Sequence, residues 1–253
     1  MTDRLKGTVA LVTGASSGIG EATARALAAQ GARVALVARR KENLERIALE
    51  IGGQGHTALA IEADVTDQDQ VIAAVDRTVD DFGRLDIVVN NAGVMLLGPI
   101  PDAPTEEWDR MIDINLKGLM YVTHAALPHL LDAVGTSERK TADLVNISSV
   151  AGRQAGAGAG VYNLTKFGVG AVSEALRQEV SRKGVRISII EPGAVETELV
   201  QHIRDGVREK AEERWAGMTT LEASDIADTI EFAVTRPAHV SLNEILIRPT
   251  EQP

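Results

Sequence analysis

Residues 9–20 read VALVTGASSGIG, and this stretch decides the fold class. Val9–Val12 is a short apolar run of the kind found in buried parallel strands. A glycine-rich turn follows, and a helix is predicted over Gly18–Gln30 with Gly31 placed to end it. The stretch therefore predicts a strand that passes through a tight turn directly into a helix.

The same alternation continues along the 253 residues. Further strands are predicted at Arg33–Ala38, Thr57–Glu62, Leu85–Asn90, Asp143–Ser148, Val185–Ile190 and Glu244–Ile247. Further helices are predicted at Lys41–Ile51, Asp67–Phe82, Thr105–Leu131, Val161–Lys183, Val200–Trp215 and Asp225–Val234. This order predicts an α/β fold of Rossmann type: a doubly wound parallel sheet of about seven strands with helices on both faces. No linker or repeat interrupts it, so residues 1–253 are expected to form a single domain.

Composition excludes several classes of function. The formal net charge of −10 argues against nucleic acid and anionic membrane surfaces as partners. The chain has no cysteine, which rules out disulfides and thiolate chemistry, and its five histidines lack metal-ligand spacing, so no metal site is expected. No apolar run approaches the ~18 residues of a membrane span, and the first residues do not read as a signal peptide. A cytoplasmic location is therefore expected.

The turn of the opening stretch points to a phosphate ligand. Its glycines let the backbone approach a pyrophosphate, and the helix start offers free N–H groups and a positive dipole end. The Gly-x-x-x-Gly-x-Gly spacing also fits an ordinary strand-to-helix turn. Its position between the first strand and the first helix favours dinucleotide binding. The residues predicted to line this phosphate site are Gly14, Ser16, Ser17, Gly18 and Ile19.

The end of the second predicted strand indicates which dinucleotide binds. An NAD site places Asp or Glu there, where the carboxylate accepts hydrogen bonds from the ribose hydroxyls. Here Ala38 fills that position, and Arg39 and Arg40 follow. Arginine offers a planar fork of donors to a phosphate, whereas a carboxylate would repel one. The sequence therefore predicts NADP(H), with Arg39 as a 2′-phosphate ligand and Arg40 as either a second ligand or a solvated charge.

A second group of residues points to proton transfer. Tyr162 and Lys166 lie four apart on a predicted helix, so their side chains share one face. A phenol has a pKa near ~10, and a neighbouring cation lowers that pKa by favouring the phenolate. Ser149 follows a strand at the sheet edge where such folds bind ligands, and Asn115 lies on the long predicted helix. Taken singly, these residues also fit a helix surface and a strand cap.

In combination the motifs resemble the short-chain dehydrogenase/reductase family, in its compact single-domain branch. The resemblance runs from Gly7 to about Pro249, with the motifs in the family's order. They are Thr13–Gly20, Asp64-Val65, Asn90–Gly93, Asn115, Ser149, Tyr162-x-x-x-Lys166 and Pro192-Gly193. The family's serine stands thirteen residues before its tyrosine, which selects Ser149 over its neighbour Ser148.

The resemblance implies an NADP(H)-dependent oxidoreductase that interconverts a ketone or aldehyde and an alcohol of small size. Tyr162 is expected to move the hydroxyl proton, and Ser149 to polarise the carbonyl oxygen. Lys166 is expected to lower the tyrosine pKa and to bind the nicotinamide ribose, and Asn115 to hold a water that links Lys166 to solvent. Further cofactor contacts implied are Asp64 and Val65 at the adenine, Asn91, Ala92 and Gly93 along the cleft, Pro192 and Gly193 beside the nicotinamide, Thr197 at its carboxamide, and Val195.

The nearest resemblance is to an NADP-linked subgroup that includes 3-hydroxy-acid (serine-type) dehydrogenases and clavulanate-aldehyde reductase. It is carried by the runs Met95–Pro99, Tyr162–Phe167 and Asn243–Thr250. It implies a homo-oligomer, either a tetramer or a dimer. The alternative function is a catalytically idle NADPH-sensing regulator on the same fold, against which the intact Ser149 and Tyr162 weigh.

Residues 195–218 stand where the family carries a substrate lid, and they are expected to form one here. Apolar side chains that either line the pocket or pack in the core are Met95, Leu96, Val150, Trp215 and Met218. Glu191, at the end of a predicted strand, is interpreted as a solvated carboxylate in preference to one that reaches the cleft. The physiological substrate and the direction of the reaction are not specified by these patterns.

Overall fold

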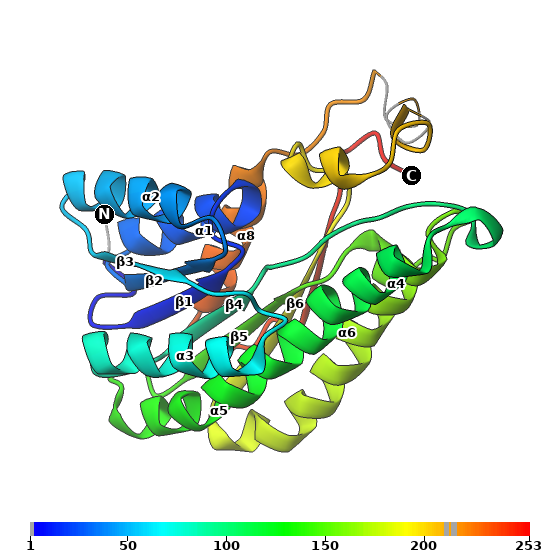
Figure 1. Cartoon of the computed structure of the whole chain (residues 1–253). Helices are drawn as coiled ribbons and strands as arrows, with labels where there is room; N and C mark the ends of the chain where they lie inside the picture. The colour runs from blue at the N-terminus through cyan, green and yellow to red at the C-terminus, as the bar shows by residue number, and fades with distance from the viewer. Residues whose placement is uncertain (1–2, 210–212, 214–216) are drawn as a thin grey trace.

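The computed structural model describes residues 3–209, 213 and 217–253. These residues contain a seven-stranded sheet in the order β3-β2-β1-β4-β5-β6-β7, with all neighbouring strands parallel (Figure 1). The strands are β1 (Val9–Thr13), β2 (Arg33–Ala38), β3 (Ala58–Glu62), β4 (Ile87–Asn90), β5 (Ala142–Ile147), β6 (Val185–Pro192) and β7 (Glu244–Ile247). The predicted doubly wound parallel sheet of about seven strands is confirmed.

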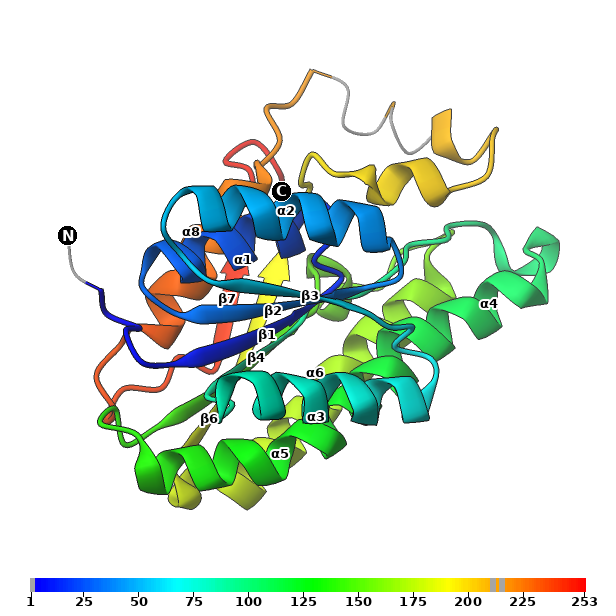
Figure 2. The ribbon, with the colours of Figure 1, turned by 60° about the vertical axis from the view of Figure 1, so that its left-hand side comes forward.

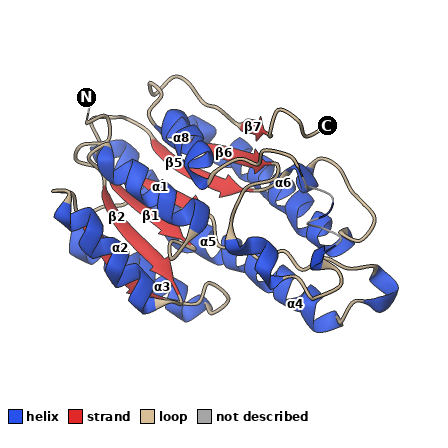
Figure 3. Cartoon of the chain, turned by 90° about the horizontal axis from the view of Figure 1, so that it is seen from above, coloured by secondary structure: helices blue, strands red, loops and turns tan. Residues whose placement is uncertain are grey.

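Helices cover both faces of the sheet, as predicted (Figures 1 and 2). One face carries α1 (Gly18–Ala29), α2 (Lys41–Gly53) and α8 (Ala223–Val234), and Figure 3 looks onto this layer from above. The other face carries α3 (Gln68–Phe82), α5 (Leu119–Thr136) and α6 (Gly160–Val180), and α4 (Thr105–Ile112) leads into α5. In the described part of the chain, each helix is too short or too polar to span a bilayer.

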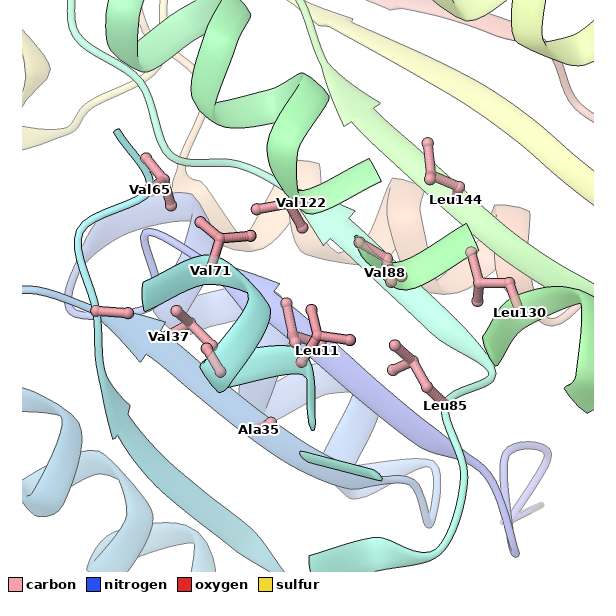
Figure 4. Close-up of a cluster of buried hydrophobic side chains, with 14 of the residues drawn as sticks. Leu11, Ala35, Val37, Val65, Val71, Leu85, Val88, Val122, Leu130 and Leu144 are labelled. Atoms are coloured by element: carbon pink, nitrogen blue, oxygen red, sulfur yellow. The ribbon is translucent and has the colours of Figure 1, made fainter. Parts of the chain in front are cut away.

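The two faces of the sheet bury two separate cores. Successive side chains of a strand point to opposite faces, so Leu11 and Val12 of β1 enter different clusters. Leu11 packs in the cluster that includes Val71 of α3 and Val122 of α5 (Figure 4). Val12 packs in the cluster that includes Ile230 of α8. With only 3% aromatic residues, the chain fills both cores with aliphatic side chains.

The predicted helix signals function as expected at α3 and α1. The Asp67 side chain caps α3 by accepting hydrogen bonds from the backbone N–H groups of Asp69 and Gln70. Gly31 follows α1 with a φ of 90°, a left-handed conformation that ends a helix. The predicted helix Thr105–Leu131 is longer in the structure and is interrupted by the π-helical segment η2 (Asp113–Gly118).

The predicted helix Val200–Trp215 is wrong over its first residues, although Arg208, Glu209 and Glu213 are helical. A short 3₁₀ helix, η5 (Glu198–His202), lies there instead, and Ile203 leaves it with extended backbone and packs into the core at 3% exposure. Gly206 then adopts a φ of 77°, which a continuing helix does not permit. The prediction for Trp215 lies outside the described residues.

Candidate active site

A cleft of about 980 Å³ follows the carboxyl ends of the central strands. This is the edge at which open parallel sheets bind ligands. Its wall contains Ser149 and every residue predicted to contact the cofactor. These are Gly14, Ser16, Ser17, Gly18, Ile19, Arg39, Arg40, Asp64, Val65, Asn91, Ala92, Gly93, Tyr162, Lys166, Pro192, Gly193, Val195 and Thr197. Asn115 lies behind the wall.

The glycine-rich turn after β1 is built for close approach. Gly14 has a φ of 64°, and a Cβ added there would lie 2.9 Å from the Ala92 Cα. A Cβ on Gly20 would lie 2.3 Å from the Gly14 carbonyl oxygen, so neither glycine has room for a side chain. The N-cap residue Ser17 makes no side-chain hydrogen bond to the first amides of α1. This turn therefore fits the pyrophosphate of a dinucleotide, which needs free N–H groups and no intervening side chains.

Two arginines stand beside this turn at the end of β2. Arg39 is 62% exposed, with its Nη1 3.7 Å from the Asp64 Oδ2. Arg40 lies across the turn: its Nε donates to Ser16 Oγ at 3.1 Å and its Nη2 to Ser17 Oγ at 2.6 Å. Arg40 is therefore held against the turn although its side chain is 49% exposed, and its role as a second phosphate ligand stays a prediction. The two guanidinium groups form a cationic end of the cleft that fits a phosphate.

Asp64 and Val65 form the neighbouring wall after β3. The Asp64 Oδ1 accepts hydrogen bonds from the Thr66 backbone N at 2.9 Å and from Thr66 Oγ1 at 2.8 Å. This fixes the carboxylate at the cleft margin. Across the cleft, Asn91 ties the end of β4 to the turn, because its Nδ2 donates to the Thr13 carbonyl oxygen at 3.0 Å.

The structure brings Ser149, Tyr162 and Lys166 together. Ser149 precedes the 3₁₀ helix η3 (Val150–Gly152), and its Oγ accepts a hydrogen bond from the Ala151 N at 3.1 Å. Tyr162 and Lys166 lie on α6, with the Lys166 Nζ 5.7 Å from the centroid of the Tyr162 ring. The Nζ donates to the carbonyl oxygen of Ile147, the last residue of β5, at 2.9 Å. The trio therefore spans a strand end and the first turns of one helix.

Burial controls the titration of this pair. It raises the pKa of Tyr162 to about 12, and a hydrogen bond with Ser149 lowers that pKa in part. Burial lowers the pKa of Lys166 to about 8. For Tyr162, desolvation outweighs the hydrogen bond with Ser149, and the lowering of the tyrosine pKa by Lys166 stays a prediction. At neutral pH the phenol keeps its proton and most Lys166 side chains are charged.

Asn115 braces the site from behind, at 2% exposure. Its Oδ1 accepts from the Val94 N at 2.8 Å, and its Nδ2 donates to the Val94 carbonyl oxygen at 2.9 Å. The Nδ2 also donates to Thr165 Oγ1 at 3.2 Å, next to Lys166 on α6. The π-helical turn η2 carries Asn115, and such turns are often found at functional sites. The side chain thus joins the loop after β4 to α6.

The remaining predicted contacts follow β6. Thr197 caps η5, and its Oγ1 accepts a hydrogen bond from the Leu199 N at 3.4 Å. Gly193 faces Gln252, whose Oε1 accepts a hydrogen bond from the Ala194 N at 2.9 Å. Nothing in the sequence pattern indicated Gln252, because residues near position 250 reach the cleft only through the fold.

Asn163 is a second residue that the sequence did not assign. It is 4% exposed, and its Nδ2 donates to the carbonyl oxygens of Ala151 at 2.7 Å and Gln154 at 3.0 Å. Its Oδ1 accepts from the Gly156 N at 3.1 Å. Asn163 therefore fixes the glycine-rich loop between η3 and α6. An asparagine in the first turn of a helix is a usable signal for such bonds to nearby backbone.

Apolar side chains line the part of the cleft that the sequence analysis expected to receive the substrate, called the substrate end below. Met95, Val150 and Met218 line it, together with Leu199 and Val200. Leu96, in contrast, packs in the core at 6% exposure.

Glu191 is buried in the structure, whereas the sequence analysis interpreted it as a solvated carboxylate. It is 4% exposed, and its Oε1 and Oε2 accept hydrogen bonds from the Arg153 Nε and Nη2, each at 2.7 Å. Arg153 also pairs with Glu244 of β7. The solvated interpretation is wrong because Arg153 follows η3 and covers the carboxylate.

Comparison with known proteins decides the family. The family model for short chain dehydrogenases matches residues 8–208. The chain belongs to the short-chain dehydrogenase family. A relative described as an uncharacterized oxidoreductase of Staphylococcus epidermidis is 39% identical over 246 residues, which cover 97% of this chain and 99% of the relative. Glycine betaine reductase ATRR of Emericella nidulans is 39% identical over 98% of this chain, which spans 19% of that longer protein.

Solved structures of short-chain dehydrogenases share the fold along nearly the whole chain. A closed form of serine dehydrogenase complexed with NADP⁺ is 33% identical, with a TM-score of 0.86 over 97% of this chain and 96% of that one. A metagenomic short-chain oxidoreductase in complex with NADP is 32% identical, with a TM-score of 0.81 over 98% and 100%. A 3-ketoacyl-(acyl-carrier-protein) reductase from Brucella melitensis complexed with NADH is 31% identical, with a TM-score of 0.86 over 97% and 98%. Structural neighbours thus include chains with either cofactor.

Proposed function

We propose that this short-chain dehydrogenase is an NADP(H)-dependent oxidoreductase that interconverts a ketone or aldehyde and an alcohol. The observation that carries the proposal is a single cleft in which the glycine turn, two arginines and the Ser149–Tyr162–Lys166 trio share one wall. Gly14 and Ser17 would hold the pyrophosphate, and Arg39 and Arg40 the 2′-phosphate. When bound, the cofactor supplies hydride chemistry at its nicotinamide.

The residues of this chain supply the proton chemistry. Burial keeps the Tyr162 phenol protonated at neutral pH, since its pKa is raised to about 12, which suits a proton donor to a carbonyl oxygen. Ser149 Oγ, within hydrogen-bond reach of that phenol, would hold the same oxygen. Lys166 would bind the ribose and provide a positive charge behind the phenol. Asn115 would maintain the position of α6. It would also hold a water that links Lys166 to solvent.

The remaining cofactor contacts follow from the same placement. Asp64 and Val65 would border the adenine, and Asn91–Gly93 the middle of the cleft. Pro192, Gly193, Val195 and Thr197 would border the nicotinamide. Assignment to the subgroup with 3-hydroxy-acid dehydrogenases is part of the proposal, supported by the likeness to serine dehydrogenase. The homo-oligomer, the cytoplasmic location and the lid at 195–218 stay predictions.

The reaction is tested by following NADPH oxidation with a panel of ketones and aldehydes. We expect turnover of at least one class of carbonyl compound and formation of the matching alcohol. Tight NADPH binding without turnover of any compound would support the idle regulator instead. Absence of NADPH binding would contradict the whole proposal.

The cofactor choice is tested with Arg39→Asp. A charge-assisted hydrogen bond contributes about 1.5–3 kcal/mol, so we expect NADPH affinity to fall roughly 10- to 150-fold. NADH affinity should stay level or improve. Arg77→Asp, on the exposed side of α3 beside Asp81, makes the same change in net charge away from the cleft and is the control. An unchanged ratio of NADPH to NADH affinity in Arg39→Asp would place the phosphate elsewhere.

A further inference from the structure

Both arginines at the cationic end of the cleft are paired with carboxylates. Arg39 faces Asp64 at 3.7 Å, and Arg40 Nη1 donates to Glu198 Oε2 at 2.9 Å. The two acids come from different parts of the fold. Asp64 follows β3, beside the strand that carries the arginines. Glu198 is 158 residues away from Arg40 in the sequence and belongs to η5.

Three neighbours fix the Arg40 guanidinium. Ser16 and Ser17 of the glycine turn accept from its Nε and Nη2, and the Glu198 carboxylate occupies its Nη1. Arg40, followed by Ser17, lowers the pKa of Glu198, so the carboxylate is charged at neutral pH. Any anion that binds Arg40 is therefore repelled by the Glu198 carboxylate.

The pair is exposed enough to be exchanged. The Arg40 and Glu198 side chains are 49% and 48% exposed. An exposed ion pair contributes little to stability, because water screens it. A phosphate with two negative charges attracts Arg40 more strongly than one carboxylate does, and it also repels that carboxylate. The phosphate can therefore take the place of Glu198 at a modest cost in affinity.

We propose that Glu198 competes with the 2′-phosphate of NADP(H) for Arg40, and that it is a specificity-determining residue that weakens the preference for NADP(H) over NAD(H). This inference rests on the proposed function, which places the 2′-phosphate at the two arginines. Glu198 begins the segment that also contributes Leu199 and Val200 to the substrate end of the cleft. Binding of the phosphate thus removes one contact between this segment and the cofactor end.

The test is the dissociation constant of NADPH and of NADH, measured by fluorescence titration for the wild type and for Glu198→Gln. The two cofactors differ only in the 2′-phosphate, so their ratio isolates the competition. We expect Glu198→Gln to bind NADPH about 2- to 5-fold more tightly and NADH with an affinity close to that of the wild type. Glu174→Gln, in an exposed pair with Arg177 on α6, is the control for net charge and should change neither constant.

Three outcomes overturn the inference. Equal gains for NADPH and NADH would mean that Glu198 acts on a part of the cofactor that both share. Weaker NADPH binding would mean that Glu198 orients Arg40 for the phosphate. If Glu198→Gln still tightens NADPH binding when Arg40 is also replaced by Gln, then Glu198 and the phosphate do not compete for Arg40. If wild-type protein binds neither cofactor, the proposed function itself fails, and this inference fails with it.

Discussion

Two kinds of buried ionisable residue occur at the two ends of the sheet: carboxylates paired with arginines, which include Glu191 at the carboxyl end, and the pair Tyr162–Lys166, which has no charged partner among the described residues. At the amino end, buried carboxylates are fully paired. Asp86, with no exposed surface, accepts from the Arg84 Nη2 at 2.7 Å and from the Val9 N at 2.9 Å. Asp143, at 2% exposure, lies between Arg186 and Arg139, each at 2.7 Å.

At the carboxyl end, Tyr162 and Lys166 are almost as deeply buried, at 6% and 8% exposure. No carboxylate among the described residues forms an ion pair with Lys166. A buried charge with a partner holds structure, since separating the two leaves one uncompensated. A buried titratable group without a charged partner has a shifted pKa, and such groups are candidates for proton transfer. The comparison separates the paired carboxylates, which stabilise the fold, from the Tyr162–Lys166 pair, which we propose performs the chemistry.

The largest effect is expected for Tyr162→Phe at the carboxyl end. The change removes one oxygen that donates the proton in the proposed reaction, and general acid catalysis contributes about 10²–10⁴-fold. We expect kcat for a carbonyl substrate to fall by that factor. NADPH affinity and the free energy of unfolding should change little, because no charged partner loses its counter-ion.

The one other tyrosine of the chain, Tyr121 of α5, is half-buried and does not line the cleft. It therefore provides a matched control. Tyr121→Phe should leave kcat within about twofold of the wild type. Steady-state kinetics and cofactor titration measure both variants. Equal activity of Tyr162→Phe and wild type would refute the assignment of Tyr162 as the proton donor.

The next effect belongs to the amino end. Asp143→Ala leaves the Arg186 and Arg139 guanidinium groups without their shared carboxylate. Removing one partner of a buried pair costs about 3–5 kcal/mol in the free energy of unfolding. We expect this loss in urea denaturation, with NADPH affinity of the folded protein preserved because the pair lies at the opposite sheet edge.

Glu174→Ala is the matched control for Asp143→Ala, since Glu174 forms an exposed pair with Arg177 at 2.6 Å. An exposed pair contributes about 0–1 kcal/mol. Similar losses for the two variants would show that burial does not set the strength of these pairs and would remove the basis of the comparison.

The sequence predicted the fold and most of the cleft wall for physical reasons that apply locally. Apolar runs such as Val185–Ile190 give strands, and the carboxyl ends of parallel strands necessarily meet at one edge, which collects Gly14, Arg39 and Ser149. Contacts that depend on packing could not be predicted. Glu198 and Arg40 are 158 residues apart in the sequence and meet only in the folded chain. The raised pKa of Tyr162 depends on burial, which a four-residue spacing does not report.

The smallest effect concerns Lys166 and pH. Burial lowers the pKa of Lys166 from 10.5 to about 8, so above that pH the folded chain releases a proton that the unfolded chain still holds. The unfolded state then binds more protons, and the free energy of unfolding rises with pH between about 8 and 10.5. Relative to Lys166→Met, the wild type should gain about 1–3 kcal/mol in urea denaturation across this window. Since the variant shares every other titrating group, parallel profiles would show that Lys166 is not desolvated, and the contrast between the paired carboxylates and the Tyr162–Lys166 pair would disappear.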